Sequence, residues 1–501
     1  MNKPTSLYSR FFLLIAIGFV TLQGWAQQSN RSYTPKFEEA KKPVVKVPKG
    51  EDYTFGYLQV PENRQEPGGK WIKLPVYIFP SKNPQKAKDP VIYTVGGPGY
   101  TSMRAAQYIR AYQYREDRDF ILFEQRGTQY AQPNLACPEW SAALAEIYGD
   151  GDSPINPDSI LAEAALKCKK RLVAKEINLD TYRTTEIAAD LRDLVLALGI
   201  DQYNLLTLSY STKIAQVMLR DYPDGIRSVV MDSPLPLEVN YEEETLANLV
   251  ELAGRLLDQC ADDPECNAAH PQLKSRFFSF LKELEANPVS VPLPVDSAAS
   301  RDTVTYQGGD ILSLIANGST EEMAQVPALI EQLLNGDNSF LEADAANQQW
   351  TTGPGNGMGM RISVWCAEEK PFIDRDALAA QAEKYPEAAG IDPEFIPKAV
   401  CDCWGVTPED SHENKAVSSD IPVLLISGEY DIETPVKWAA AMQSNLSNSY
   451  HLVFKGWKHG PTTNWGQPCA MEAARAFFND PSKIPNNPCF EEIGGINFKS
   501  N

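Results

Sequence analysis

The chain is most constrained by one short segment, in which an apolar run ends on a serine and a helical pattern begins at once. It reads Tyr203-Asn-Leu-Leu-Thr-Leu-Ser209-Tyr-Ser-Thr-Lys213. This order predicts a strand, a sharp turn with Ser209 at its apex, and a helix. Such a turn lifts a hydroxyl above a sheet and presents the next backbone N–H, which is the geometry of a nucleophile elbow. Thr207 and Ser211 replace both glycines of the usual G-x-S-x-G pattern.

The surrounding sequence alternates strand and helix patterns from about residue 52 to residue 235. Val91–Val95 is a short apolar strand that runs into a glycine-rich loop, and Thr184–Leu198 has the apolar spacing of an amphipathic helix. Helical patterns then dominate up to about residue 415, after which strands return at Val423–Ser427 and Tyr450–Phe454. A chain of 501 residues can bury a large core and still carry an insertion. We therefore predict an α/β fold with one mostly parallel, doubly wound sheet and a helical lid insertion.

The N-terminus is typical of a removable signal peptide. Lys3 and Arg10 precede the apolar run Phe11–Val20, and Gly24-Trp-Ala26 is a small-x-small cleavage site. The run has about half of the roughly 20 residues that a membrane-spanning helix needs. We predict a signal peptide over residues 1–26, the first part of the core over 27–235, the lid over 236–415 and the rest of the core over 416–501. The mature chain is expected to be periplasmic or secreted, without stable membrane insertion.

Charge and cysteine content narrow the possible partners. The formal net charge is −20, which disfavours nucleic acid and anionic membranes. Nine cysteines in an exported chain suggest disulfides. Their spacing suggests the pairs Cys137–Cys168, Cys260–Cys266, Cys469–Cys489, and Cys366 with Cys401 or Cys403. A zinc site at Cys401, Cys403 and His412 has no second ligand pair at a matching spacing, so it is the weaker interpretation.

A serine nucleophile needs a base and a group that orients the base. Of the four histidines, His459 stands in a loop just beyond the carboxyl end of a strand, where active sites of open α/β sheets collect. His270, His412 and His451 fall in the lid, a polar linker and a strand. Asp431 follows the strand Val423–Ser427 and is our candidate orienting group, with Glu429 and Glu433 as alternatives. The order Ser209, Asp431, His459 is the one expected of an α/β-hydrolase.

An acyl-transfer enzyme must also stabilise a developing oxyanion. The amide of Tyr210, directly after the serine, is one candidate donor. The loop Gly96-Gly-Pro-Gly99 follows a strand, and its glycines let a backbone amide approach closely. Gly97 is the candidate for the second donor. No metal or organic cofactor is implied, because this machinery needs none.

Several motifs together resemble the exported α/β-hydrolases of the proline iminopeptidase and tripeptidyl aminopeptidase family. They are Gln59–Asn63, Gly96–Gly99, Glu124-Gln-Arg-Gly-Thr128, the elbow, Asp232-Ser-Pro234, Cys260–Cys266 and Gly428-Glu-Tyr-Asp431. The family usually has an aspartate where this chain has Glu124. The resemblance implies removal of residues from peptide N-termini, with lid carboxylates binding the substrate's ammonium group. The lid offers Glu242, Glu243 and Glu244, but none of them matches a known position of the family.

Three functions are compatible with these patterns. The first is an exported serine aminopeptidase that acts through Ser209, His459 and Asp431. The second is an esterase or other small-acyl hydrolase with the same triad, since fold and triad do not choose the leaving group. The third is a peptide-binding homologue in which the altered elbow has silenced Ser209. The sequence leaves the oligomeric state and the number of residues removed open.

Overall fold

The computed structural model describes residues 32–149, 156–293, 302–317, 319–347 and 353–498. The signal peptide predicted over residues 1–26 lies outside them. Nine strands form one sheet in the order β1-β2-β3-β5-β4-β6-β7-β10-β11. The strands are β1 (Lys36–Glu39), β2 (Thr54–Pro61), β3 (Trp71–Phe79), β4 (Val91–Thr94), β5 (Phe120–Phe123), β6 (Tyr203–Leu208), β7 (Ile226–Asp232), β10 (Val423–Gly428) and β11 (Ser449–Phe454).

The direction of the strands follows the α/β-hydrolase pattern. From β5 to β11 every neighbouring pair is parallel, whereas β1, β2 and β3 pair antiparallel, as do β3 and β5. The chain crosses over between β4 and β5, so that β4 lies beside β6. This strand order confirms the predicted α/β-hydrolase fold with a mostly parallel sheet.

Helices cover both faces of the sheet. A parallel sheet needs such cover because the side chains on both of its faces are apolar. In β6, Leu205 packs against α4 (Thr184–Ala197), α5 (Ser211–Asp221) and α16 (Val436–Gln443), in one core cluster. Its neighbour Leu206 points the other way, toward η1 (Ser102–Ala111) and α17 (Cys469–Asn479). Alternation along one strand therefore supplies two cores, one on each face.

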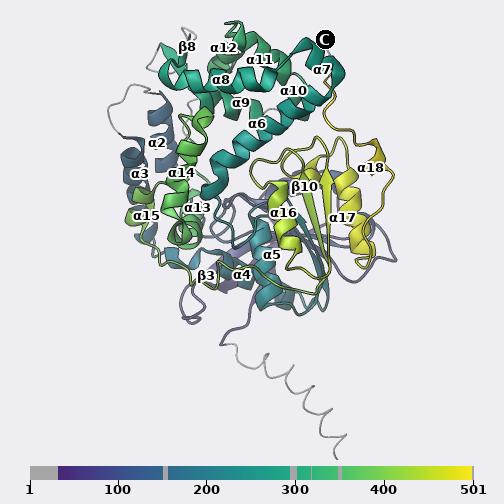
Figure 1. The fold of residues 1–501 in the computed structure, drawn as a ribbon. Coiled ribbons are helices and arrows are strands. Elements are labelled where there is room, and N and C mark those ends of the chain that lie inside the picture. Colours follow the sequence, from purple (N-terminus) through teal and green to yellow (C-terminus); the bar gives the residue numbers. More distant parts are fainter. Residues whose placement is uncertain (1–31, 150–155, 294–301, 318, 348–352, 499–501) are drawn as a thin grey trace, which may run out of the picture.

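Between β7 and β10 the chain builds a helical layer that lies over one end of the sheet (Figure 1). The layer has its own apolar core around α6, α8, α9 and α11. Its elements are η4 (Glu242–Glu244), α6 (Thr245–Asp262), α7 (Pro264–Ala269), α8 (Leu273–Ala286), β8 (Val289–Pro292), β9 (Thr303–Tyr306), α9 (Gly308–Asn317), α10 (Thr320–Met323), α11 (Val326–Leu334), α12 (Ser339–Asn347), α13 (Met358–Val364), η5 (Trp365–Glu369), η6 (Lys370–Phe372), α14 (Arg375–Lys384), η7 (Pro386–Ala388) and α15 (Lys398–Trp404). The predicted three-part division of the mature chain stays a prediction.

Two helices from an earlier part of the chain join this layer, which the sequence did not reveal. They are α2 (Pro138–Gly149) and α3 (Pro157–Val173), which follow β5. Apolar residues of both pack against α13 and α15 in a cluster that includes Trp140, Trp365 and Trp404. Figure 1 shows α2 and α3 beside α14 and α15, away from the sheet. The α/β alternation up to residue 235 is therefore interrupted once by a helical pair.

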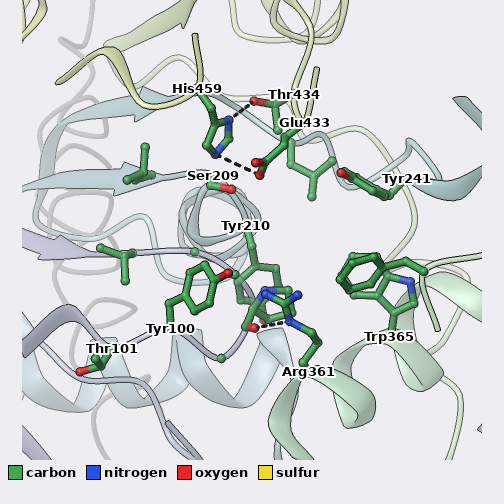
Figure 2. Close-up of a pocket in the computed structure, with 18 of the residues that line it drawn as sticks. Tyr100, Thr101, Ser209, Tyr210, Tyr241, Arg361, Trp365, Glu433, Thr434 and His459 are labelled. Atoms are coloured by element: carbon green, nitrogen blue, oxygen red, sulfur yellow. Dashed lines mark hydrogen bonds and ion pairs between the residues drawn. The ribbon is translucent and has the colours of Figure 1, made fainter. Parts of the chain in front are cut away.

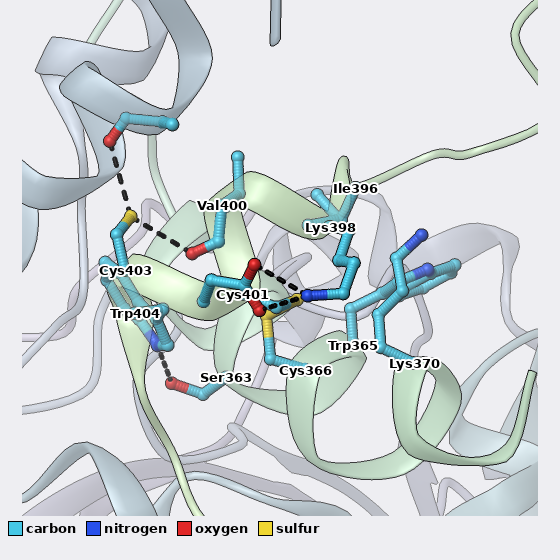
Figure 3. Close-up of a disulfide and its surroundings, with 12 residues drawn as sticks. Ser363, Trp365, Cys366, Lys370, Ile396, Lys398, Val400, Cys401, Cys403 and Trp404 are labelled. Atoms are coloured by element: carbon cyan, nitrogen blue, oxygen red, sulfur yellow. Dashed lines mark hydrogen bonds and ion pairs between the residues drawn. A yellow bond between two sulfur atoms is a disulfide. The ribbon is translucent and has the colours of Figure 1, made fainter. Parts of the chain in front are cut away.

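Four disulfides are present, and three of them are the pairs that the spacing suggested: Cys137–Cys168, Cys260–Cys266 and Cys469–Cys489. The pairing left open is Cys366–Cys401 (Figure 3), and Cys403 is a free, half-buried thiol. Cys401 is therefore not available to the zinc site considered above.

Candidate active site

Ser209 occupies the turn between β6 and α5, as the sequence predicted. Its φ is 60°, in the left-handed region that non-glycine residues seldom adopt. The Ser209 amide donates to the carbonyl of Asp232 at 2.9 Å, which ties the turn to the end of β7. The backbone strain of a nucleophile elbow is thus present at this residue.

Thr207 and Ser211, which replace the elbow glycines, fit into the turn, and Ser209 keeps its strained conformation. Both are buried. The Ser211 hydroxyl accepts the Leu208 N–H at 2.8 Å and lies 2.8 Å from the carbonyl oxygen of Thr94, while the Thr207 hydroxyl donates to the Val230 carbonyl at 3.3 Å. Their polar atoms therefore find partners inside the turn, and neither residue displaces Ser209.

The Gly96–Gly99 loop lies directly against this turn. A Cβ atom added to Gly96 would stand 2.6 Å from the Tyr210 nitrogen and 2.7 Å from the Ser209 Cβ, so only glycine fits there. Gly97 has a φ of 119°, which favours glycine as well. Neither the Gly97 amide nor the Tyr210 amide has a hydrogen-bond acceptor within the described residues. Two backbone donors without a protein acceptor therefore belong to the Ser209 turn and to the glycine loop packed against it.

His459 and Asp431 meet at the carboxyl ends of β10 and β11. The Nδ1 atom of His459 lies 2.8 Å from the Oδ2 atom of Asp431, whose side chain is buried. The Thr434 hydroxyl donates to the same oxygen at 2.7 Å, and the backbone amides of Glu433 and Thr434 donate to the Oδ1 atom at 2.9 Å each. These donors hold Asp431 ionised: burial raises its pKa, but His459 and the hydrogen bonds outweigh burial and lower it.

The two other candidate orienting groups lie elsewhere. Glu429 accepts from the Gly456 amide at 2.8 Å and from Gln259 at 3.0 Å. Glu433 faces the opposite ring nitrogen, with its carboxylate 3.6 Å from the Nε2 atom of His459. Burial by itself lowers the pKa of the imidazole, but nearby carboxylates, that of Asp431 first, raise the pKa of His459 to about 9.

Ser209, His459, Tyr210 and Gly97 line one cavity of about 800 Å³ between the sheet and the helical layer. Figure 2 shows the Ser209 hydroxyl and the His459 ring facing the same space, with Glu433 beside the ring. Within the described residues, Ser209 makes no side-chain hydrogen bond to His459. Four of the five predicted site residues thus line one cavity, and the fifth, Asp431, contacts the ring of one of them, His459.

Asp232 supports the site in a way that the sequence did not predict, although its motif was recognised. Its buried carboxylate accepts the Thr462 amide at 2.8 Å and also the Thr462 hydroxyl, which anchors the loop that carries His459. Ser233 accepts the Gly460 amide from the same loop at 2.9 Å. Because the Asp232 carbonyl also holds Ser209, this short segment fixes the serine and the histidine loops relative to each other.

The lid acids do not face this cavity. Glu242 is buried in an ion pair with Lys370 and accepts the Trp365 ring N–H at 2.9 Å, and Glu244 pairs with Lys437 at 2.8 Å. The other histidines are also elsewhere: His451 lies 3.0 Å from the Ser427 hydroxyl, and His270 lies 3.6 Å from Glu331. The lid contributes Arg361, Trp365 and Phe395 to the cavity instead.

Comparisons with known proteins find similarity to peptidases. Residues 389–489, which contain Asp431 and His459, match the family model described as TAP-like protein. The chain is 28% identical to a tripeptidyl aminopeptidase of Streptomyces lividans over 463 residues, covering 84% of this chain and 80% of that protein. It is 22% identical to the serine protease Hip1 of Mycobacterium tuberculosis over 471 residues, covering 87% and 86%.

Among solved structures, the proline iminopeptidase of Mycobacterium smegmatis is similar, with 15% identity and a TM-score of 0.39. The match covers 85% of this chain and 98% of the proline iminopeptidase chain. The predicted resemblance to tripeptidyl aminopeptidases and related hydrolases is confirmed by the sequence relatives, and the chain is a serine hydrolase with the α/β-hydrolase fold.

Proposed function

We propose that this protein is an exported serine aminopeptidase that releases one or a few residues from peptide N-termini. The observation that carries the proposal is the arrangement of five groups, four of which line one cavity while the fifth, Asp431, contacts His459. These are the strained Ser209, the His459–Asp431 pair, and the unpaired amides of Tyr210 and Gly97. Each group has a separate place in acyl transfer, and together they account for every proton and charge in the reaction.

In the proposed reaction the Ser209 Oγ atom attacks the scissile carbonyl carbon and passes its proton to the Nε2 atom of His459. Asp431 accepts the Nδ1–H, so it fixes the tautomer and stabilises the imidazolium. The oxyanion is bound by the two amides. His459 then gives the proton to the departing amine, which leaves an ester on Ser209. Water, deprotonated by His459, hydrolyses that ester and regenerates the hydroxyl.

The preference for peptides rests on the relatives, because the same triad serves esterases. Both the tripeptidyl aminopeptidase and the serine protease align over more than four fifths of this chain, helical layer included. That layer lines the cavity from the side opposite the sheet loops, through Arg361, Trp365 and Phe395.

Export is part of the proposal. It is supported by the signal-peptide pattern over residues 1–26 and by four disulfides, which persist in oxidising compartments. Among the helices of the described residues, none is both long and apolar enough to cross a membrane. We expect a periplasmic or secreted protein.

Labelling with a fluorophosphonate tests the nucleophile. We expect one adduct on Ser209 in the folded protein, none in Ser209→Ala, and normal labelling in Ser447→Ala, which changes an exposed serine. A folded protein that takes up no label would leave the silent, peptide-binding alternative as the better description.

Peptide digestion then separates peptidase from esterase. Unblocked peptides incubated with the protein should lose single residues, dipeptides or tripeptides from the N-terminus, read by mass spectrometry. N-acetylated peptides and Ser209→Ala serve as controls. Turnover of p-nitrophenyl esters together with intact peptides would support the esterase alternative instead.

A further inference from the structure

Arg361 brings an unpaired positive charge to the wall of the active-site cavity. It belongs to α13 in the helical layer, and Figure 2 shows its side chain reaching toward the space below Ser209 and Tyr210. The protein has a formal net charge of −20, so most of its arginines have acidic neighbours within reach. Within the described residues, however, Arg361 forms no ion pair with any carboxylate. The cavity wall therefore holds a cation that no described carboxylate contacts at ion-pair distance.

The arginine is held in place by contacts that leave its charge uncompensated. Its guanidinium carbon lies 5.2 Å from the ring centre of Tyr100 and 5.1 Å from that of Phe395, so it sits between two aromatic rings. The Nε atom donates to the Pro98 carbonyl at 2.9 Å. In the part of the chain that is described, the two terminal nitrogens donate to no protein acceptor. The side chain is thus fixed in position, with its two terminal nitrogens free.

A planar fork with two free N–H edges is suited to a carboxylate, which it can bind through two parallel hydrogen bonds. Arg104 lies exposed at the same cavity and also forms no ion pair with described residues, so the positive potential extends toward the rim. We propose that Arg361 binds a carboxylate of the substrate, and that the preferred substrates are peptides that place a carboxylate near the scissile bond. This inference deepens the proposed function and rests on it.

A second explanation uses Arg361 only as a brace. Its Nε–H bond to Pro98 supports the loop that carries Gly97, and Gly357, at the start of α13, packs backbone to backbone against Gly99. A brace would need the Nε atom alone and would affect all substrates equally. A carboxylate receptor distinguishes substrates that carry a carboxylate from substrates that carry none. The two explanations are therefore distinguished by how ligand affinity depends on ligand charge. A loss of activity would be expected from either of them.

The test measures binding to the Ser209→Ala protein, so that no ligand is consumed. Three ligands are compared by calorimetry: tri-alanine with a free C-terminal carboxylate, tri-alanine amide, and Ala-Ala-Glu amide. We expect one or both carboxylate ligands to bind about tenfold to a hundredfold more tightly than tri-alanine amide. Preference for tri-alanine identifies the C-terminal carboxylate as the bound group. Preference for Ala-Ala-Glu amide identifies an acidic side chain.

The same measurements on Ser209→Ala/Arg361→Gln should bring these affinity ratios close to one, whereas Ser209→Ala/Arg192→Gln, which removes a charge from α4 outside the cavity, should keep them. Equal affinity for all three ligands, or a preference that survives Arg361→Gln, overturns the inference. Fluorophosphonate labelling of the single variant Arg361→Gln keeps the two proposals apart. Retained labelling, together with equal affinity of the Ser209→Ala protein for all three ligands, would reject the carboxylate receptor and leave the hydrolase intact.

Discussion

At the scale of single residues, Glu433 has the clearest effect on the chemistry. Its carboxylate faces the Nε2 atom of His459 at 3.6 Å, on the side of the ring that must accept the serine proton. It is one of the carboxylates that raise the pKa of His459 to about 9, after the larger contribution of Asp431. At neutral pH the imidazole is therefore mostly protonated and cannot act as a base. Activity should rise as pH increases toward this pKa.

We predict that Glu433→Gln moves the rising limb of kcat/KM against pH to lower pH. Removing a negative charge beside the ring destabilises the imidazolium, so the pKa of His459 falls and more of the base is available at pH 7. Glu433→Asp keeps the charge and should retain most of the original midpoint. A glutamine variant whose midpoint coincides with the unmutated protein would show that Glu433 does not influence the base.

Gly96 is a second residue that matters for the chemistry, because there is no space for a side chain at its position. A methyl group there would come within 2.6 Å of the Tyr210 nitrogen, which is a proposed oxyanion donor. We predict that Gly96→Ala lowers kcat about a hundredfold or more, because the loop must move and misplace a donor. Gly68→Ala, at a position with no atom within 4 Å, is the matched control and should be nearly silent. Similar rates in both variants would remove this loop from the oxyanion site.

At the scale of elements, Glu124 joins the end of β5 to the loop after β4. It is fully buried and accepts the Thr101 hydroxyl at 2.8 Å, the Ser102 amide at 3.0 Å and the Tyr130 amide at 3.2 Å. Burial, opposed by these hydrogen bonds, raises its pKa to about 7. The family's usual aspartate is one methylene shorter than Glu124, so its carboxylate would stand further from these three donors.

We predict that Glu124→Asp lowers the free energy of unfolding by about 1–3 kcal/mol, because at least one buried donor loses its acceptor. Urea unfolding, followed by circular dichroism, measures the change. Glu491→Asp, an exposed position on α18 (Cys489–Glu492), should change it by less than about 0.5 kcal/mol. Equal stabilities of the two variants would mean that the loop rearranges to follow the shorter side chain.

At the scale of the whole molecule, the helical layer is joined from segments far apart in the chain. The Cys366–Cys401 disulfide closes a separation of 35 residues and links α15 to η5, which carries the cavity residue Trp365 (Figure 3). Nearby, α3 from the first half of the chain packs against α15. Cross-links of this length commonly contribute about 2–5 kcal/mol.

We predict that Cys366→Ala/Cys401→Ala lowers the Tm of the protein by several degrees, whereas Cys403→Ala, which removes the free thiol, leaves it nearly unchanged. Differential scanning calorimetry provides both values. Alkylation of the unfolded, unreduced protein should modify Cys403 only. A large loss of stability in Cys403→Ala, or labelling of Cys401, would contradict the observed pairing.

Local sequence patterns were sufficient for the elements around the site. The apolar run before Ser209, the spacing in Thr184–Leu198 and the strands before Asp431 and His459 predicted β6, α4, β10 and β11 with boundaries close to those observed. They were sufficient because strands and amphipathic helices follow from the alternation of nearby residues. The order of the strands also placed the candidate residues at one edge of the sheet. Their catalytic roles stay predictions.

Contacts between residues that are distant in the sequence could not be predicted from local patterns. The attachment of α2 and α3 to the lid, the choice of Cys401 over Cys403, and the approach of Arg361 and Glu433 to the cavity all join residues that are distant in sequence. The residues next to each of these in the chain carry no information about such contacts, because the contacts depend on how separate helices pack around one core. The sequence by itself therefore determined the sheet and the candidate nucleophile, base and orienting acid. Only the tertiary structure decided which charges surround them.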